Sequence, residues 1–158
     1  MQGRLFTSAL EVVDEALSNT VPITMDDLRP LFRLEAAYML LWSSMERYAS
    51  LRYHFRANAT EKVERIALEP AFRDALHAYV KEGRSVYRAD KPKERLDLDP
   101  NNPAGSLDYY YQIRHNLVHR GKGAFDDYDR LKVSLQELLA IYRTTLAAAF
   151  EESKFAVQ

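Results

Sequence analysis

The 158-residue sequence contains no cysteine. A chain without cysteine forms no disulfide bond, has no thiolate nucleophile and lacks the ligands of a cysteine-based zinc site. It also has no apolar run that approaches the roughly 20 residues of a membrane-spanning helix. The first residues lead directly into a charged amphipathic pattern and lack the apolar core of a signal peptide. We therefore expect a soluble, cytoplasmic protein that does not enter a membrane.

The sequence has little net charge, because 22 lysines and arginines are balanced by 23 aspartates and glutamates, which gives a formal charge of −1 at pH 7. Such a protein is no polycation, so any contact with nucleic acid must come from a local basic patch. Hydrophobic residues make up 47% of the chain, which is enough for a folded core. At this length we expect a single domain that covers residues 1–158.

No segment shows the apolar–polar alternation of a half-buried strand, whereas apolar residues recur at helical spacing along most of the chain. The long helices are expected over residues 3–18, 28–55, 106–121 and 127–152. Asn58, with Glu61 three residues later, resembles a capping box and predicts a short helix. Pro70 interrupts this helix, and Gly83 is expected to end it. The predicted fold class is all-α, a bundle of four to five helices.

Residues 84–105 are polar and rich in proline, and they predict a long loop that ends at Ser106, the expected N-cap of the next helix. The loop has a basic bias from Arg84, Arg88, Lys91, Lys93 and Arg95. Two interpretations follow. Most charge runs are simply solvated, so the segment is a linker in the first interpretation. In the second, it is an arm that lies along a polyanion.

Groups suited to phosphate chemistry gather in residues 114–122. Arginine offers a permanent, forked positive charge that matches a phosphate, and histidine moves protons near neutral pH. Together they can cleave a phosphodiester, because RNA supplies its own nucleophile, the 2′-hydroxyl group. Arg114 and His119 are the candidate catalytic pair. Arg120 and Lys122 would extend the positive surface for an RNA backbone.

The spacing of this pair imposes a constraint. On a straight helix, residues five apart are separated by about 140° around the axis and by about 7.5 Å along it, so Arg114 and His119 do not converge. Either the helix ends near Gly121 and lets His119 turn, or a second subunit brings another pair across a two-fold axis. In a purely structural alternative, Arg114 pairs with Glu35 or Glu46, and the terminal cations only complement the helix C-terminus.

His115 and His119 are four residues apart and share a helix face, a spacing that also occurs in zinc proteases. No glutamate follows His115, and the sequence offers no third ligand nearby. We therefore predict no metal site and no cofactor.

The Arg-x4-His pattern from Arg114 to His119 resembles the motif of HEPN domains (higher eukaryotes and prokaryotes nucleotide-binding), small α-helical bundles that carry it late in a long helix. Residues 41–46, Leu-Trp-Ser-Ser-Met-Glu, resemble the aromatic and acidic pattern of an early long helix in that family. The resemblance implies a metal-independent endoribonuclease that acts as a homodimer. Such domains serve as toxins, in antiphage defence or in RNA processing.

By this resemblance, Arg114 would stabilise the transition-state phosphate and His119 would transfer protons. The supporting residues at the RNA cleft would be His115, Asn116, Arg120, Lys122 and Glu46. One subgroup, which pairs with a nucleotidyltransferase antitoxin, carries a tyrosine two residues after the histidine, where this chain has Gly121. Other members are non-catalytic, so the alternative is a helical module that binds a nucleotide or a protein. The expected partners are RNA, a second copy of the chain, and an antitoxin or other protein.

Overall fold

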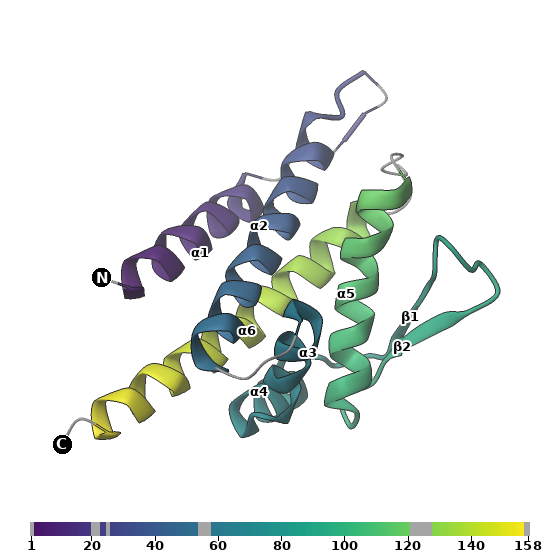
Figure 1. Ribbon diagram of the computed structural model, residues 1–158. Coiled ribbons are helices and arrows are strands. Elements are labelled where there is room, and N and C mark those ends of the chain that lie inside the picture. The colour runs from purple at the N-terminus through teal and green to yellow at the C-terminus, as the bar shows by residue number, and fades with distance from the viewer. Residues whose placement is uncertain (1, 20–22, 25, 54–57, 121–127, 157–158) are drawn as a thin grey trace.

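The computed structural model describes residues 2–19, 23–24, 26–53, 58–120 and 128–156 (Figure 1). These ranges are mainly α-helical, as the periodicity predicted. The helices are α1 (Gln2–Ser18), α2 (Arg29–Arg52), α3 (Ala59–Glu64), α4 (Pro70–Tyr79), α5 (Pro103–Arg120) and α6 (Tyr128–Ala156). A 3-10 helix, η1 (Arg65–Leu68), joins α3 to α4, and two strands, β1 (Arg84–Tyr87) and β2 (Arg95–Leu98), precede α5.

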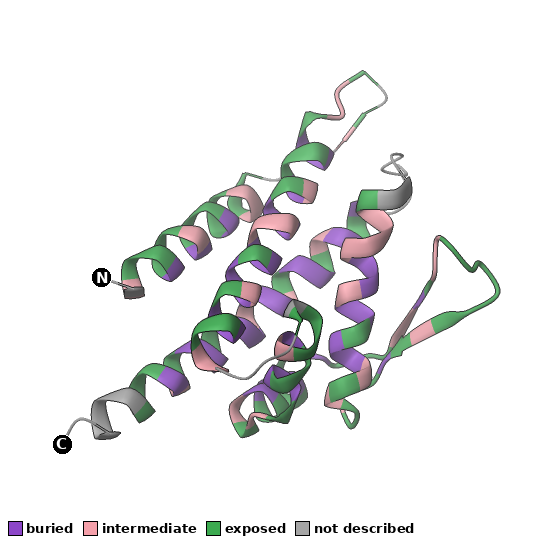
Figure 2. Cartoon of the chain, in the orientation of Figure 1, coloured by how far each residue is buried: buried purple, intermediate pink, exposed green. Residues whose placement is uncertain are grey.

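The core lies between α2, α5 and α6, with α1 and α4 packed against it (Figure 2). Its largest fully buried side chains are aromatic: Trp42, Tyr38, Tyr109, Tyr110 and Tyr142. Each such ring removes on the order of 150–250 Å² from water, so these residues dominate the core energetics. Among the described residues, the Trp42 Nε1 and the Tyr109 hydroxyl have no hydrogen-bond partner, whereas the Tyr142 hydroxyl donates to the carbonyl oxygen of Ser44 at 3.0 Å. This hydrogen bond joins α2 to α6.

The region between α2 and β1 follows from three local signals. The Asn58 Oδ1 accepts a hydrogen bond from the Glu61 amide at 2.9 Å, which confirms the predicted cap. Pro70 occupies the first turn of α4, where its missing amide proton costs nothing, so it restarts the helix. The predicted helix end at Gly83 is wrong, because α4 already ends at Tyr79. Any Cβ at Gly83 would lie 3.0 Å from the Leu98 carbonyl oxygen, so this glycine permits a close strand approach.

Replacing Asn58 with alanine is expected to lower the free energy of unfolding by about 1 kcal/mol, because the Glu61 amide loses its acceptor. Asn58→Asp, which keeps an acceptor oxygen, serves as the control and is expected to stay close to the wild type. Urea denaturation measures both changes. Equal losses in the two variants would contradict the capping role.

The predicted loop over 84–105 is wrong in part, because it contains an antiparallel hairpin. β1 pairs with β2 in the register Arg84↔Leu98 to Tyr87↔Arg95. Each strand has only four residues, and only Val86 and Leu98 among them are buried, so the alternation is too short to recognise in the sequence. The fold therefore adds a small two-stranded sheet to the helices.

The start of α5 also differs from the prediction. The helix begins at Pro103, and the Asn102 side chain accepts a hydrogen bond from the Gly105 amide at 3.0 Å. Asn102 therefore caps α5, and Ser106 does not. Instead, the buried Ser106 hydroxyl donates to the carbonyl oxygen of Asp99 at 2.6 Å and ties the end of the hairpin to the first turn of α5.

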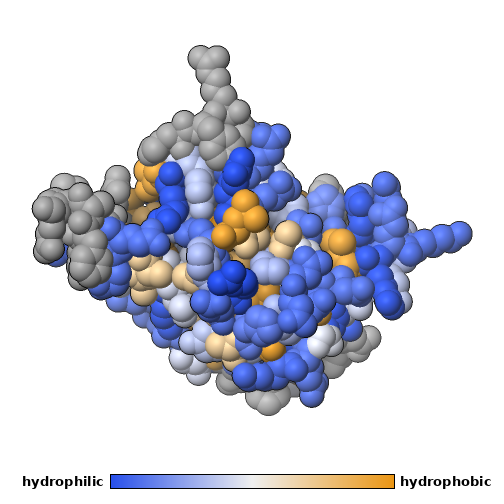
Figure 3. Space-filling view, turned by 90° about the horizontal axis from the view of Figure 1, so that it is seen from below, coloured by the Kyte–Doolittle hydropathy of each residue, from blue (hydrophilic) through white to orange (hydrophobic). Residues whose placement is uncertain are grey.

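Hydrophobic side chains are scattered on the surface of the described residues. Figure 3, which views the molecule from below, shows small hydrophobic areas separated by hydrophilic ones. The exposed large hydrophobic residues belong to different elements, for example Leu68 in η1, Tyr79 in α4 and Val118 in α5. Among the described helices, none is long and apolar enough to cross a membrane.

Candidate functional site

The candidate motif lies in the second half of α5, which runs between α2 on one side and the hairpin on the other (Figure 1). The inward side of this helix is buried at Tyr110 and Ile113. Arg114 and His115 are half-buried, and Val118 is 56% exposed. The fold therefore buries one side of α5 and leaves Arg114 and Val118, one turn apart, at the surface.

Arg114 is held toward α2. Its Nη2 lies 3.4 Å from Oε1 of Glu46, and its guanidinium carbon lies 5.4 Å from the ring centre of Tyr111. The Tyr111 ring in turn packs edge-on against Trp42, with ring centres 5.4 Å apart. The Arg114 Nε is buried and has no hydrogen-bond partner among the described residues. Of the two carboxylates proposed from the sequence, the structure pairs Arg114 with Glu46.

This ion pair remains partly accessible to water. The side chains are 26% exposed at Arg114 and 32% exposed at Glu46. Water screens such a pair, so we expect it to contribute no more than about 1 kcal/mol to stability. Tyr111 and Glu46 orient the Arg114 guanidinium, which nevertheless remains partly exposed to solvent.

Asn116 faces the other neighbour of α5, the hairpin. Its Nδ2 donates to the carbonyl oxygen of Tyr87 at 2.9 Å, and its Oδ1 accepts from the amide of Ala89 at 3.0 Å. The Gln112 side chain donates to the same Oδ1 at 2.8 Å. The polar atoms of Asn116 are therefore occupied in docking β1 onto α5, a contact that no spacing in the sequence indicated.

His115 lies close enough to the hairpin to act on its charges. The pKa of Asp90 is held below its usual range mainly by a hydrogen bond from Arg88, and the positive charge of His115 contributes in the same direction. The hairpin therefore forms one wall beside the motif. Glu46 and Tyr111 mark the opposite side.

His119 and Arg120 belong to the last turn of α5, but their side chains lie outside the described part of the structure, as does Lys122. Each helical residue advances by about 100°, so position 119 lies between His115 and Asn116 around the axis. Arg114 points toward α2, whereas position 119 is on the hairpin side. One copy of α5 therefore does not bring both positions of the Arg-x4-His motif to the same side.

The cations of the hairpin are mostly paired within it. Arg88 contacts Asp90 at 2.9 Å and Glu94 at 3.0 Å. Arg95 lies 3.4 Å from Asp97. These pairs reduce the basic bias, so the structure gives little support to an arm that binds a polyanion by charge alone. Nor is the segment a plain linker, because it is folded and docked.

Sequence reasoning missed a partly buried polar cluster at the base of the hairpin. Arg84 forms a two-bonded ion pair with Glu137 of α6, and the Tyr110 hydroxyl donates to the same carboxylate at 3.2 Å. Burial works against the charge of Arg84, but its partners in this cluster, Glu137 first among them, together keep the pKa of Arg84 above its usual value. Arg84 and Glu137 are 53 residues apart, and no local pattern joins them. The cluster fastens the hairpin to the core.

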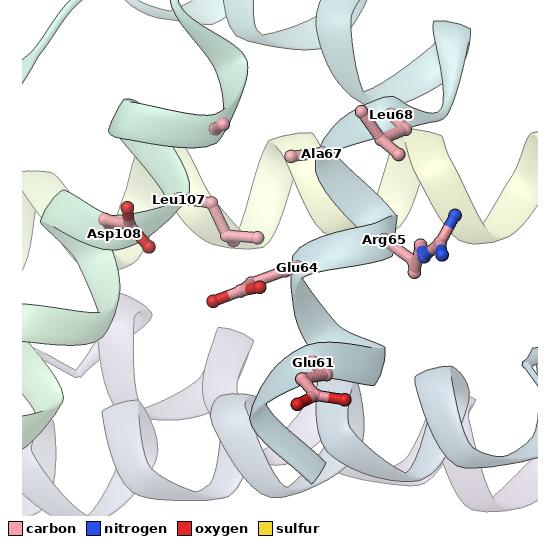
Figure 4. Close-up of a pocket in the computed structure, with 8 residues that line it drawn as sticks. Glu61, Glu64, Arg65, Ala67, Leu68, Leu107 and Asp108 are labelled. Atoms are coloured by element: carbon pink, nitrogen blue, oxygen red, sulfur yellow. The ribbon is translucent and has the colours of Figure 1, made fainter. Parts of the chain in front are cut away.

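A pocket of about 570 Å³ lies apart from the motif, between α3–η1 and the start of α5. Glu64 reaches across it toward Leu107 and Asp108, whereas Arg65 points the other way (Figure 4). Burial, followed by the charge of Glu64, raises the pKa of Asp108. Three carboxylates line the pocket, those of Glu61, Glu64 and Asp108, so it repels phosphate and is a poor RNA site.

The described residues thus bring Arg114, Glu46 and Tyr111 together on one side of α5 and place Asn116 and His115 beside the hairpin. Within these residues, no group of three or more His, Cys, Asp or Glu side chains is arranged to hold a metal ion. Comparison of the chain with protein-family models, with curated proteins and with solved structures gives no match.

Proposed function

We propose that the protein is a metal-independent endoribonuclease of the HEPN type. The observation that carries this proposal is the oriented guanidinium of Arg114, held by Glu46 and Tyr111 at the exposed side of α5, in the same helix as His119. A preorganised donor is worth most where negative charge develops, as on the phosphate of a transition state.

The reaction would proceed without an enzyme nucleophile. The ribose 2′-oxygen attacks the adjacent phosphorus while the bond between that phosphorus and the 5′-oxygen of the next nucleotide breaks. A base accepts the 2′-hydroxyl proton, and an acid returns a proton to the departing 5′-oxygen. The products are a 2′,3′-cyclic phosphate and a 5′-hydroxyl. In this scheme His119 moves protons, and Arg114 stabilises the charge on the phosphate.

A second copy of the chain would complete the site, because one α5 directs positions 114 and 119 to different sides. Val118 lies one turn beyond Arg114 and is 56% exposed, which suits an aliphatic contact at the centre of a two-fold interface. In such an isologous contact, the Arg114 of one copy can meet the His119 of the other. This arrangement is the second of the two that the sequence left open.

The direct test is incubation of the purified protein with RNA in the presence of a chelator. We expect cleavage that survives removal of metal ions and leaves 2′,3′-cyclic phosphate ends, which phosphatase treatment and mass spectrometry identify. Intact RNA under all conditions would contradict the proposal. So would products with 5′-phosphate ends, because the 2′-hydroxyl route cannot form them.

The alternative function is a non-catalytic helical module that binds a nucleotide or a protein. The Arg114–Glu46 pair favours it, because an arginine that already has a carboxylate partner can be purely structural. This alternative predicts RNA or protein binding without cleavage. The chelator experiment separates the two functions.

Replacing Val118 with glutamate is expected to weaken the proposed dimer by at least about tenfold, since two carboxylates would enter an apolar contact. RNA cleavage should fall with the fraction of dimer. Val12 of α1 is a matched control, because it is 52% exposed and lies on another helix. Sedimentation velocity of the wild type, Val118→Glu and Val12→Glu measures the effect. A monomeric wild type at micromolar concentration would overturn the dimer.

A further inference from the structure

The outer face of the hairpin carries an aromatic side chain beside a cation. Strand residues alternate between two faces, and in β1 Val86 is 6% exposed whereas Tyr87 is 53% exposed. Tyr87 therefore belongs to the outward face. Its partner in the register is Arg95 of β2, which is also exposed. Directly opposite residues share a face, so Tyr87 and Arg95 lie side by side on the outside of the hairpin.

The contact of Asn116 with β1 shows which part of α5 lies beside the outward face of the hairpin. A strand carbonyl lies in the plane of the sheet, and the Tyr87 carbonyl accepts the Asn116 hydrogen bond, so α5 meets the open edge of β1. The Val86 face joins the core. The opposite face, with Tyr87, points away from the core, and α5 borders it through Asn116, the chain neighbour of the half-buried His115.

We propose that Tyr87 and Arg95 form a platform that stacks an unpaired nucleobase next to the Arg-x4-His motif, so that the substrate is single-stranded RNA. The inference rests on the proposed function. Aromatic side chains bind splayed bases by stacking, and duplex bases are already stacked on one another. Among the described residues, Arg95 pairs with Asp97 at 3.4 Å, and both side chains are largely exposed, so water weakens this pair and the guanidinium remains accessible to a phosphate.

The test measures binding to a labelled 2′-O-methyl oligoadenylate, which lacks the attacking hydroxyl and stays intact during the measurement. We expect Tyr87→Ala to raise the dissociation constant by about 5- to 150-fold, since one base loses its stacking partner. Tyr87→Leu should raise the dissociation constant as much as Tyr87→Ala does, because leucine keeps apolar bulk without an aromatic face. Tyr87→Phe should bind about as tightly as the wild type. Tyr79→Ala is the matched control, because Tyr79 is 47% exposed on α4, and it should leave binding unchanged.

The outcomes separate this inference from the proposed function. If the wild type cleaves RNA but Tyr87→Ala and Tyr87→Leu bind the oligonucleotide as the wild type does, the platform is wrong and the nuclease stands. Equal affinity of the wild type for the single strand and for its duplex would overturn the substrate class. A wild type that neither binds nor cleaves RNA overturns both.

Discussion

Replacing Arg114 with alanine is expected to lower kcat for RNA cleavage by about 10²–10³-fold, the typical effect of removing one preorganised donor at a developing oxyanion. Arg114→Lys should recover little of the rate, because lysine keeps the charge but loses the forked geometry. The loss should appear in kcat rather than in KM, since the contact tightens only in the transition state. Single-turnover and steady-state assays on a defined oligonucleotide measure both parameters.

A loss of stability would not explain the expected fall in kcat of the Arg114→Ala variant. The Arg114–Glu46 pair is partly exposed, so its removal should lower the free energy of unfolding by no more than about 1 kcal/mol. Arg73→Ala is a suitable control, because Arg73 also has a carboxylate neighbour, Asp74 at 3.3 Å, but lies on α4. We expect it to cleave RNA at the wild-type rate.

Two results would contradict the role of Arg114. The first is cleavage by Arg114→Ala at the wild-type rate. The second is a stability loss that Glu46→Ala reproduces in full, with no change in RNA cleavage in either variant. That second pattern would identify the pair as purely structural. His119→Ala provides an independent check, with an expected loss of about 10²–10⁴-fold and of one limb of the pH–rate profile.

Replacing Glu137 with alanine is expected to lower the free energy of unfolding by about 1–3 kcal/mol. The substitution removes the partner of Arg84 and leaves that guanidinium charge uncompensated at a site where it is only 25% exposed. The Tyr110 hydroxyl loses its acceptor as well. For a domain with a total stability of about 5–15 kcal/mol, this loss is a large fraction. Urea denaturation at neutral pH measures it.

A double variant tests the physical reason. Arg84→Met with Glu137→Leu removes both charges together and should recover much of the stability, because no charge is then left unpaired. The control is Asp14→Ala, whose partner Arg143 is 3.7 Å away in an exposed pair and which should cost less than about 1 kcal/mol. If Glu137→Ala is no worse than this control, the cluster does not hold the hairpin.

Helix positions were predictable from the sequence because their apolar periodicity extends over many turns. The long helix predicted over 28–55 is present as α2, Arg29–Arg52, and the predicted cap at Asn58 is present. The hairpin was not predictable. Six of its eight strand residues are exposed or half-buried, and two long-range contacts hold it: Arg84 bonds Glu137 of α6, and Asn116 of α5 bonds the Tyr87 carbonyl of β1. Such contacts depend on how distant elements pack, which local patterns do not contain.

The candidate site was predictable in part. The sequence placed Arg114 on a helix and named two carboxylates, Glu35 and Glu46, as its partners. Only the packing of α2 against α5 selects Glu46. The resemblance to HEPN domains implied that Asn116 supports the RNA cleft. Its hydrogen bonds to Tyr87 and Ala89 give it a docking role that requires the hairpin to exist.

The hydrogen bonds of Asn116 also bear on the order in which the chain folds. The bond from Asn116 to Tyr87 joins residues that are only 29 positions apart in the sequence, whereas the bond between Ser44 and Tyr142 joins residues 98 positions apart. By loop-closure entropy, the longer closure costs about 1 kcal/mol more. The hairpin and α5 can therefore assemble from nearby contacts before α6 reaches α2. The Arg114 partner Glu46 comes from α2, so the arginine is oriented only once the more distant helices have closed.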